Sequence, residues 1–184
     1  EVGGGVGSFA SLYGKRKKIV VTDSNDYYLS RLRDRFIGHP FLTIEKLDLS
    51  KPLIKGSPLI SAFDTVVSIN DLEFEENHKV ALDNLFLLLR KGGHLFTLVP
   101  SEPERFGELD KRIGRYRRYS KADLEQNLKD TGFQIQKISY FDSISSLIPS
   151  FQTKAFDWCV PLVRQFTPQE PSKGHSLIAI AVKP

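Results

Sequence analysis

The sequence contains no methionine, only one cysteine and no apolar run as long as a membrane-spanning helix. A single cysteine, Cys159, cannot form an internal disulfide, which excludes a disulfide-stapled secreted fold and favours a reducing, cytoplasmic location. Because a spanning helix needs about 20 apolar residues, we expect no membrane span. Apolar residues make up 40% and charged residues 26% of the 184 positions, as in folded globular proteins.

The excess of positive charge is small, because 26 Lys and Arg residues face 22 Asp and Glu residues, a net charge of +4. Nucleic-acid-binding domains usually carry a stronger basic character, so we expect no nucleic-acid partner. The basic run at 15–18 precedes a strand-like segment and is interpreted as a solvated turn. A second basic stretch, at 105–118, is interleaved with aromatic residues.

Strand-like and helix-like segments alternate along the chain, which predicts a doubly wound, mostly parallel α/β sheet. Strands are predicted at 18–23, 41–47, 63–69, 94–99, 133–140 and 176–182. Helices are predicted around Leu29–Phe36, over 78–90, and from the N-cap Ser120 to Gly132. The last two strands have no long helix between them, so they are compatible with an antiparallel edge.

A glycine-rich loop opens the sequence as Glu1-Val2-Gly3-Gly4-Gly5-Val6-Gly7. In open α/β sheets, ligands bind beyond the carboxyl ends of the strands, where glycines let the backbone approach them closely. The strict G-x-G-x-x-G dinucleotide fingerprint is absent, although the register from Gly5 fits the looser form ending in alanine. A glycine-rich tail is the alternative.

Asp23 makes cofactor binding the better interpretation of this loop. It ends the next predicted strand, 16 residues after Gly7. A carboxylate there can accept hydrogen bonds from two neighbouring ribose hydroxyls. An acid that merely closes a turn is the alternative for Asp23 alone. The loop itself does not separate a nicotinamide cofactor from other adenosine cofactors.

The acid-x-G-x-G-x-G form of the loop resembles the first motif of class I S-adenosylmethionine (SAM)-dependent methyltransferases, and the resemblance extends over nearly the whole chain. Residues 63–73 resemble the fourth strand of that fold with its following loop, and 176–183 resemble the closing strand. Residues 90–95 resemble the turn before the fifth strand, with Lys91 where proline is common. Residues 99–119 resemble a subgroup with the pattern V-P…G…D…G-H-Y-R-R-Y.

This resemblance implies a Rossmann-like methyltransferase fold with a seven-stranded sheet whose last strand is antiparallel. It implies one SAM-binding domain over 1–184 that lacks residues at its N-terminus, SAM as the cofactor and no metal. The implied cofactor-binding residues come from the loop, the strand ends and the turn after the fourth strand: Glu1, Gly3, Gly5, Gly7, Asp23, Asp48, Leu49 and Asn70. A turn cap before Pro52 is an equally good interpretation of Asp48.

The sequence departs from the related patterns where a histidine base is common. The pattern N-x-L-E-H ends here in Phe74, and G-H-Y-R-R-Y has Arg115 at its second position. Methyl transfer would then depend on proximity, with three candidate catalytic residues: Glu73, Tyr116 and Tyr119. The remaining histidines are interpreted as solvated (His78), structural (His94) or loop residues without an identified partner (His39 and His175).

Two segments, 100–119 and 141–172, are candidate substrate or lid insertions. The candidate substrate-binding residues are Arg115, Arg117 and Arg118, because a guanidinium pairs bidentately with phosphate or carboxylate. The alternative is that the last two arginines pair with helix acids such as Asp123 and Glu125. The aromatic-rich segment 141–166 would line a lipid or aromatic pocket, form a dimer face or pack in the core.

Three functions remain open at this point. The leading one is a SAM-dependent methyltransferase for a small-molecule, lipid-linked or sugar-linked acceptor. The second is a non-catalytic SAM-binding or regulatory domain, suggested by the two missing histidines. The third is a nicotinamide-dependent oxidoreductase, which the loop permits but which no Tyr-x-x-x-Lys pair accompanies.

Overall fold

The computed structural model describes residues 1–13, 18–141 and 174–184. Most of the predicted insertion 141–172, including Cys159, therefore lies outside the described residues, as does most of the basic run at 15–18. Within the described ranges, no helix has both the length and the apolar character that crossing a membrane requires.

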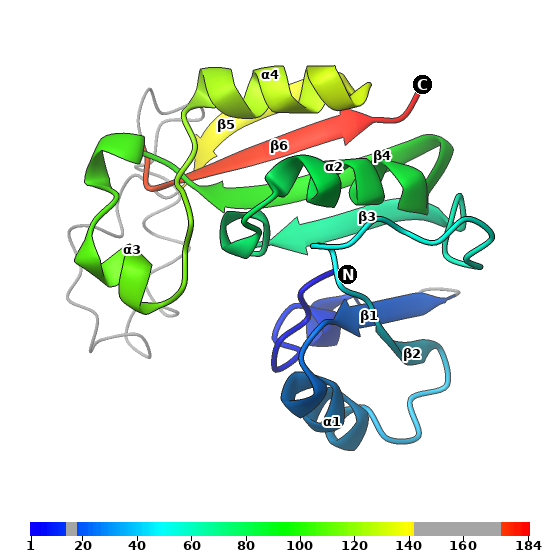
Figure 1. Ribbon diagram of the computed structural model, residues 1–184. Coiled ribbons are helices and arrows are strands. Elements are labelled where there is room, and N and C mark those ends of the chain that lie inside the picture. The colour runs from blue at the N-terminus through cyan, green and yellow to red at the C-terminus, as the bar shows by residue number, and fades with distance from the viewer. Residues whose placement is uncertain (14–17, 142–173) are drawn as a thin grey trace, which may run out of the picture.

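Six strands in the described part of the chain form two sheets (Figure 1). The smaller sheet is a parallel pair of β1 (Ile19–Asp23) and β2 (Leu42–Lys46). The larger sheet has the order β3-β4-β6-β5, formed by β3 (Phe63–Ile69), β4 (Leu89–Pro100), β6 (Ser176–Val182) and β5 (Gln134–Phe141). β3 is parallel to β4, and β6 is antiparallel to both of its neighbours.

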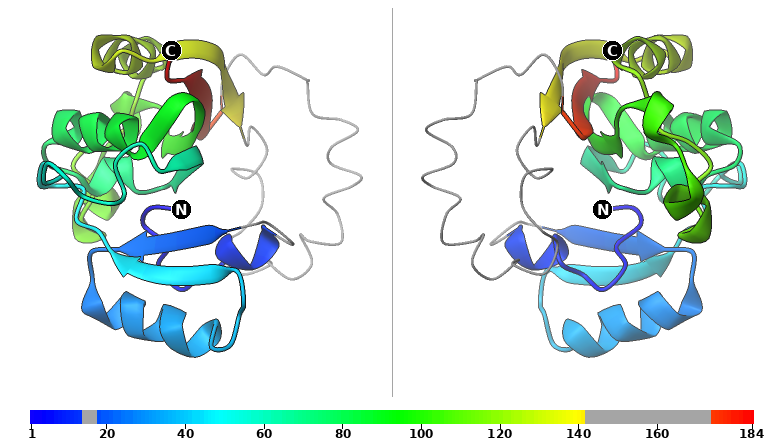
Figure 2. Two further views of the ribbon diagram at one scale, coloured as in Figure 1. Left: turned by 90° about the vertical axis from the view of Figure 1, so that its right-hand side faces the viewer. Right: turned by 90° about the vertical axis from the view of Figure 1, so that its left-hand side faces the viewer.

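Four α-helices and three short 3-10 turns complete the described elements. The α-helices are α1 (Asp26–Arg35), α2 (His78–Leu88), α3 (Glu108–Arg112) and α4 (Lys121–Thr131). The 3-10 turns are η1 (Ala10–Leu12), η2 (Leu72–Phe74) and η3 (Pro103–Arg105). α2 and α4 pack against each other and on one face of the larger sheet, while α1 packs on the smaller sheet (Figure 2).

The linking segment, residues 1–4, lies between β1 and β3 and joins the two sheets (Figures 1 and 2). On one side, Thr22 N donates to Glu1 O and Gly4 N donates to Thr22 O, both at 2.8 Å. On the other side, Val2 N donates to Val67 O at 2.9 Å. The order across the molecule is therefore β2, β1, the linking segment, β3, β4, β6 and β5.

The structure thus differs from the expected single sheet of seven strands. Residues 1–4 form only an isolated parallel bridge, between Val2 and Ser68, and not a strand of their own. The physical reason is that Gly3 follows at once with a φ of 63°, a left-handed conformation that ends extended backbone. The expected antiparallel direction of the last strand is confirmed, but β6 is internal and β5 forms the edge.

Two clusters of buried apolar side chains follow the two sheets. The larger cluster fills the space between the four-stranded sheet and helices α2 and α4, with Leu82, Leu85 and Leu95 among its most buried members. The smaller cluster lies between β1, β2, η1 and α1: Ala10, Ile19, Val21, Leu32 and Leu42. The helical stripe predicted at 78–90 is confirmed, although α2 ends at Leu88 because β4 already begins at Leu89.

Candidate functional site

The candidate site lies along the edge of the sheets where β1, β3 and β4 end (Figure 1). Parallel strands end at a common edge, so this edge collects the loops that follow them. The glycine loop, Asp23, the turn after β3 and segment 100–119 all meet there. In Figure 1, α3 lies beyond the tips of β3 and β4. Because β6 is antiparallel, its first residues also lie at this edge.

Asp23 holds the glycine loop in place. Its Oδ2 accepts a hydrogen bond from Gly5 N and its Oδ1 accepts one from Asn25 N, both at 2.9 Å. A carboxylate has about four lone-pair positions, so two remain for further donors. The backbone therefore orients the carboxylate of Asp23 and leaves acceptor positions free for the hydroxyls of a ribose.

The loop forms a cradle that side chains would fill. Gly3 and Gly5 have φ values of 63° and 52°, which only glycine adopts readily. A Cβ on Gly3 would lie 2.3 Å from Asp71 Oδ1, whereas a Cβ on Gly5 would meet nothing within 4 Å. The Gly5 face is therefore open to a ligand, and the Gly3 face is covered by an acid. Gly7 lies in the same loop, also with a left-handed φ, of 79°.

Asp71 lies against the glycine loop at Gly3 and was not among the residues that the sequence indicated. Burial is the largest cause that raises the pKa of Asp71, and with the charges of Glu75, Asp23 and Glu73 it brings that pKa to about 7. A nearby cation would favour the ionised form of Asp71, because it would offset the repulsion from the other carboxylates. The available signal was its place directly after Asn70, in the loop that follows a predicted strand.

Asn70 makes the turn at the end of β3. Its φ of 50° is left-handed, and its backbone N donates to Leu98 O of β4 at 2.9 Å. Asparagine tolerates this conformation better than most residues. The turn exposes Asn70 at the edge next to the linking segment, where the predicted cofactor contact would be made.

Asp48 lies in a tight local turn. It accepts a hydrogen bond from Ser50 N at 3.0 Å and pairs with Lys51 Nζ at 2.7 Å. The hydrogen bond from Lys51, followed by that from Ser50, lowers the pKa of Asp48. These contacts are the ones expected if Asp48 caps the turn before Pro52. The neighbouring Leu49 is buried.

Glu1, in the linking segment, is also shielded from solvent, and this burial raises the pKa of its carboxyl.

Asn84 of α2 anchors the loop that contains Leu49. Its Nδ2 donates to Leu49 O at 3.0 Å and to Lys51 O at 2.8 Å, and its Oδ1 accepts from Leu53 N at 2.9 Å. The Asn84 side chain is buried and makes three hydrogen bonds to backbone outside its helix. In the sequence this residue was hidden among the apolar positions of a predicted helix.

Glu73 is buried directly behind the turn after β3. It has no exposed surface, and Arg115 Nε lies 3.6 Å from its Oε1, beyond hydrogen-bond distance. Burial raises the pKa of Glu73 to about 7, and the nearby Arg115 opposes this rise. Tyr116 N donates to Glu73 O at 2.8 Å, so two of the three candidate catalytic residues share a backbone contact.

The two candidate tyrosines have opposite environments. Tyr116 is 52% exposed, whereas Tyr119 is 2% exposed and belongs to the larger apolar cluster. Tyr119 Oη donates to Leu72 O at 3.3 Å, and burial raises the pKa of its hydroxyl. The expectation that His78 is solvated is wrong, because its Nδ1 lies 3.3 Å from Tyr119 Oη and its ring is half-buried against that side chain.

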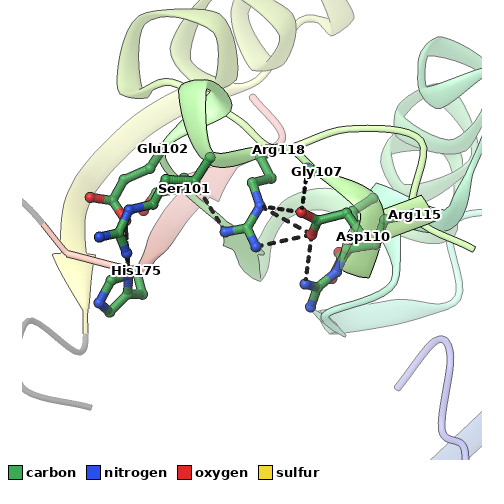
Figure 3. Close-up of polar contacts among 9 residues, drawn as sticks. Ser101, Glu102, Gly107, Asp110, Arg115, Arg118 and His175 are labelled. Atoms are coloured by element: carbon green, nitrogen blue, oxygen red, sulfur yellow. Dashed lines mark hydrogen bonds and ion pairs between the residues drawn. The ribbon is translucent and has the colours of Figure 1, made fainter. Parts of the chain in front are cut away.

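Two arginines of segment 100–119, Arg115 and Arg118, converge on Asp110, as Figure 3 shows. Asp110 accepts hydrogen bonds from Arg115 Nη1 at 3.1 Å, from Arg118 Nε at 3.0 Å and from Gly107 N at 3.1 Å. Burial alone would raise the pKa of Asp110, but the hydrogen bonds from Arg118, Gly107 and Arg115 together lower it.

The acids expected to pair with these arginines have other partners. Asp123 accepts from Ser120 Oγ, and Glu125 pairs with Lys129. Arg117 reaches a backbone oxygen instead, with its Nη2 donating to Glu76 O at 2.5 Å. Asp110 was not a candidate site residue, because in the sequence it only matches the D of the subgroup pattern V-P…G…D…G-H-Y-R-R-Y.

A family model described as a methyltransferase domain matches residues 1–95. The chain belongs to this methyltransferase family. No curated protein matches the sequence significantly. Its cofactor is SAM, and the cradle at Gly5, the two remaining lone pairs of Asp23 and the acid at Asp71 fit that cationic molecule. Among the described residues, no His, Cys, Asp or Glu side chains group as a metal site.

Solved structures show that the methyltransferase has the fold expected of that family. The SAM-dependent methyltransferase from Mesorhizobium loti has a TM-score of 0.71 at 16% identity, over 98% of this chain and 88% of that one. A chain from the complex containing the Haloferax volcanii Trm112 methyltransferase activator has a TM-score of 0.72 at 15% identity, over 100% and 80%. The trans-methyltransferase CalH, in complex with S-adenosylhomocysteine, has a TM-score of 0.68 at 20% identity, over 100% of this chain and 50% of that one.

Proposed function

We propose that this methyltransferase transfers a methyl group from SAM to a small-molecule, lipid-linked or sugar-linked acceptor. The proposed acceptor site lies beyond the ends of β3 and β4, against segment 100–119. The observation that carries the proposal is the acidic, glycine-lined edge formed by Gly5, Asp23 and Asp71. We also propose that 1–184 act as one SAM-binding domain and that 141–172 contribute to the acceptor side.

The charge at this edge favours SAM over a dinucleotide. A dinucleotide places its pyrophosphate on the glycine loop, where Asp71 Oδ1 crowds Gly3 so closely that a Cβ would lie 2.3 Å away. A phosphate there would face Asp71, whose pKa is raised by burial and then by the charges of three other carboxylates. SAM brings an ammonium and a sulfonium instead, and both would relieve that repulsion.

Each predicted cofactor residue has a proposed task in this arrangement. Asp23 would accept the ribose hydroxyls, and the backbone of Gly3, Gly5 and Gly7 would pass close to the amino-acid part of SAM. The Asp48–Leu49 turn would lie at the adenine, Asn70 would border the methyl side, and Glu1 would support the glycine loop through its pairing with β1. When bound, SAM supplies an activated methyl group on a positively charged sulfur.

We propose that the protein accelerates the transfer mainly by proximity and by excluding water. Glu73 and Tyr119 are buried and would position the turn after β3, whereas the exposed Tyr116 is able to touch an acceptor. Arg117 is the candidate that remains for anionic acceptor groups, because Arg115 and Arg118 are held by Asp110.

Thermal unfolding in the presence of SAM, S-adenosylhomocysteine and NAD tests the cofactor assignment. A ligand that binds only the folded state raises its stability according to ligand concentration over Kd. We expect both adenosyl compounds to raise the Tm and NAD to leave it unchanged. A shift with NAD alone would overturn the assignment. Transfer of a labelled methyl group from SAM to a panel of acceptors then tests the activity.

A non-catalytic SAM-binding domain is the second candidate. The observation that favours it is the contact between Phe74 and Arg115, which occupy the two positions where the related patterns have histidine. Tight binding of SAM without methylation of any acceptor class would support this function and reject the enzyme. Methylation of one acceptor above the background rate would reject it.

A further inference from the structure

A histidine and a glutamate meet beyond the end of β4 and the start of β6, apart from the pairing of Asp110 with Arg115 and Arg118 (Figure 3). His175 Nδ1 lies 2.8 Å from Glu102 Oε2, although the residues are 73 positions apart. Ser101 N donates to His175 O at 2.9 Å, which extends the pairing of the two strands and brings the side chains together. The two side chains are 24% and 19% exposed, so they are shielded but reachable from solvent.

Two groups face His175 Nδ1, and they favour opposite tautomers. Arg105 can only donate to Nδ1, whereas the Glu102 carboxylate can only accept from it. We take the shorter contact, the one of 2.8 Å to Glu102, to set the tautomer, with Nδ1 donating. Arg105 Nη1 lies 3.1 Å from the same Nδ1 and 3.4 Å from Glu102 Oε2, and it then pairs with the carboxylate. In neutral imidazole this leaves Nε2 as a free proton acceptor.

The backbone of Glu102 is strained. Its φ of 60° and ψ of 70° lie in the left-handed region, which residues with a Cβ seldom adopt. Such conformations persist where the surrounding structure enforces them, and they concentrate at functional sites. Here the strained residue is the one whose carboxylate orients the imidazole.

The pair lies at the edge where the proposed methyl transfer takes place. β3 is next to β4 and β4 is next to β6, and neighbouring strands are about 4.8 Å apart. The start of β6 is therefore about 10 Å from the end of β3 along the edge. The acceptor hydroxyl would lie over the end of β4, between Asn70 and His175, where one oxygen can meet both the methyl group and the base.

From this geometry, and resting on the proposed methyltransferase function, we propose that His175 is the general base for a hydroxyl-bearing acceptor and that Glu102 positions it. Nε2 takes the hydroxyl proton as the acceptor oxygen bonds to the methyl carbon. The carbon–sulfur bond breaks with its electron pair on sulfur, which releases S-adenosylhomocysteine. The imidazolium formed is stabilised by Glu102 and later loses its proton to water.

This proposal predicts the acceptor class. A hydroxyl is a poor nucleophile until its proton is removed, whereas a thiol loses its proton more readily. A base at the acceptor edge therefore fits oxygen methylation. The two histidine positions of the related patterns are occupied by Phe74 and Arg115, so His175 would supply the base from a different part of the chain.

The orientation of His175 is tested without an acceptor. The chain has 4 histidines, so nitrogen-15 shifts of their ring nitrogens can be assigned by substitution. We expect the Nδ1–H tautomer for His175 at pH 8, and a shift toward the other tautomer in Glu102→Gln. An Nε2–H tautomer in the unsubstituted protein would overturn the proposal, because no free Nε2 would face the acceptor.

The catalytic role is tested with labelled SAM and matched panels of hydroxyl, thiol and amine acceptors. For a hydroxyl acceptor, His175→Gln should lower kcat roughly 100-fold or more with SAM affinity unchanged, and Glu102→Gln should shift the pH profile. The exposed His39→Gln is the control and should leave the rate unchanged. An unchanged kcat in His175→Gln, or turnover of thiols or amines alone, would overturn the proposal. SAM binding without any product would instead reject the proposed function itself.

Discussion

The guanidinium carbon of Arg115 lies 5.9 Å from the centre of the Phe74 ring, within reach of a cation–π contact. These are the two positions at which the related sequence patterns carry histidine, one after the fourth strand and one in segment 100–119. The two departures from the pattern therefore lie at one place in the structure. Together with Glu73 and Asp110, they form a charged and aromatic cluster beside the proposed acceptor site.

Replacing Arg115 with alanine should destabilise the fold. The side chain is 20% exposed and is the cation between two buried acids, Glu73 and Asp110. Removing one partner of a buried ion pair costs about 3 kcal/mol or more. Urea denaturation measures this loss. The control is Arg112→Ala on the exposed face of α3, and an equal change in both variants would contradict the structural role of Arg115.

Arg118 and Arg117 should respond differently to substitution. Arg118 donates to both carboxylate oxygens of Asp110, whereas Arg117 reaches only a backbone oxygen. We expect Arg118→Ala to lower stability by about 3 kcal/mol or more and Arg117→Ala to lower it by less than about 1 kcal/mol. If Arg117 binds an anionic acceptor, its variant should raise the acceptor KM with SAM affinity unchanged. A larger stability loss in Arg117→Ala would reject this division.

Asp23→Asn should weaken binding of S-adenosylhomocysteine roughly 10- to 100-fold, since hydrogen bonds to a charged group contribute about 1.5–3 kcal/mol each. The new amide would also place a donor against the N–H of Gly5 or Asn25. Isothermal titration gives the Kd. Asp26→Asn is the matched control, because that acid pairs with Lys46 on the surface and is 80% exposed. Equal affinities in the two variants would show that Asp23 does not contact the ligand.

Asp71 should make cofactor binding pH-dependent. Its pKa is about 7 in the protein without ligand, and a bound ammonium would favour the ionised form. Binding therefore releases a proton, and affinity for SAM should rise as the pH increases from about 6 to 8. Titrations across this range should show a slope in the unsubstituted protein and in the exposed-site control Asp34→Asn. The slope should be reduced in Asp71→Asn, and an unchanged slope there would remove Asp71 from the cofactor site.

Glu73 should make the fold less stable as pH rises. Its pKa is raised from 4.5 to about 7, so the folded protein binds this proton more tightly than the unfolded chain does. The stabilisation is present in full below about 4.5 and is lost as the pH rises through about 7, in total on the order of 3 kcal/mol. Glu73→Gln resembles the protonated form, so its unfolding free energy should fall less between pH 5 and 8. Parallel pH profiles for the two proteins would refute this.

Much of the fold could be predicted because its determinants are local. The strand at 63–69 was predicted with the observed bounds, and Ser120 caps α4 by accepting from Asp123 N at 3.0 Å, as its spacing indicated. The five-residue helix α3 was missed because periodicity needs a longer window. The segment between the glycine loop and β3 was correctly divided into strand, helix and strand for the same local reasons.

The site was less predictable, because its side chains meet through tertiary contacts. Asp110 pairs with Arg115 and Arg118 because segment 100–119 folds back on itself, and no regular spacing in the sequence predicts that turn. Glu102 and His175 are 73 positions apart and meet only because β6 pairs with β4. Asp71 comes just after a predicted strand, as Asp23 and Asp48 come at or just after the ends of theirs, so the same local pattern marks it in the sequence.

The linking segment has a mechanical consequence for the methyltransferase. The smaller sheet has its own apolar cluster, and it is joined to the larger one chiefly through the hydrogen bonds of residues 1–4 and the loop that Asn84 holds. A ligand resting on Gly5 and Asp23 from one side and Asn70 from the other would cross this junction. Cofactor occupancy would then act as an additional cross-link, so amide hydrogen exchange in β1 and β2 should slow when the site fills.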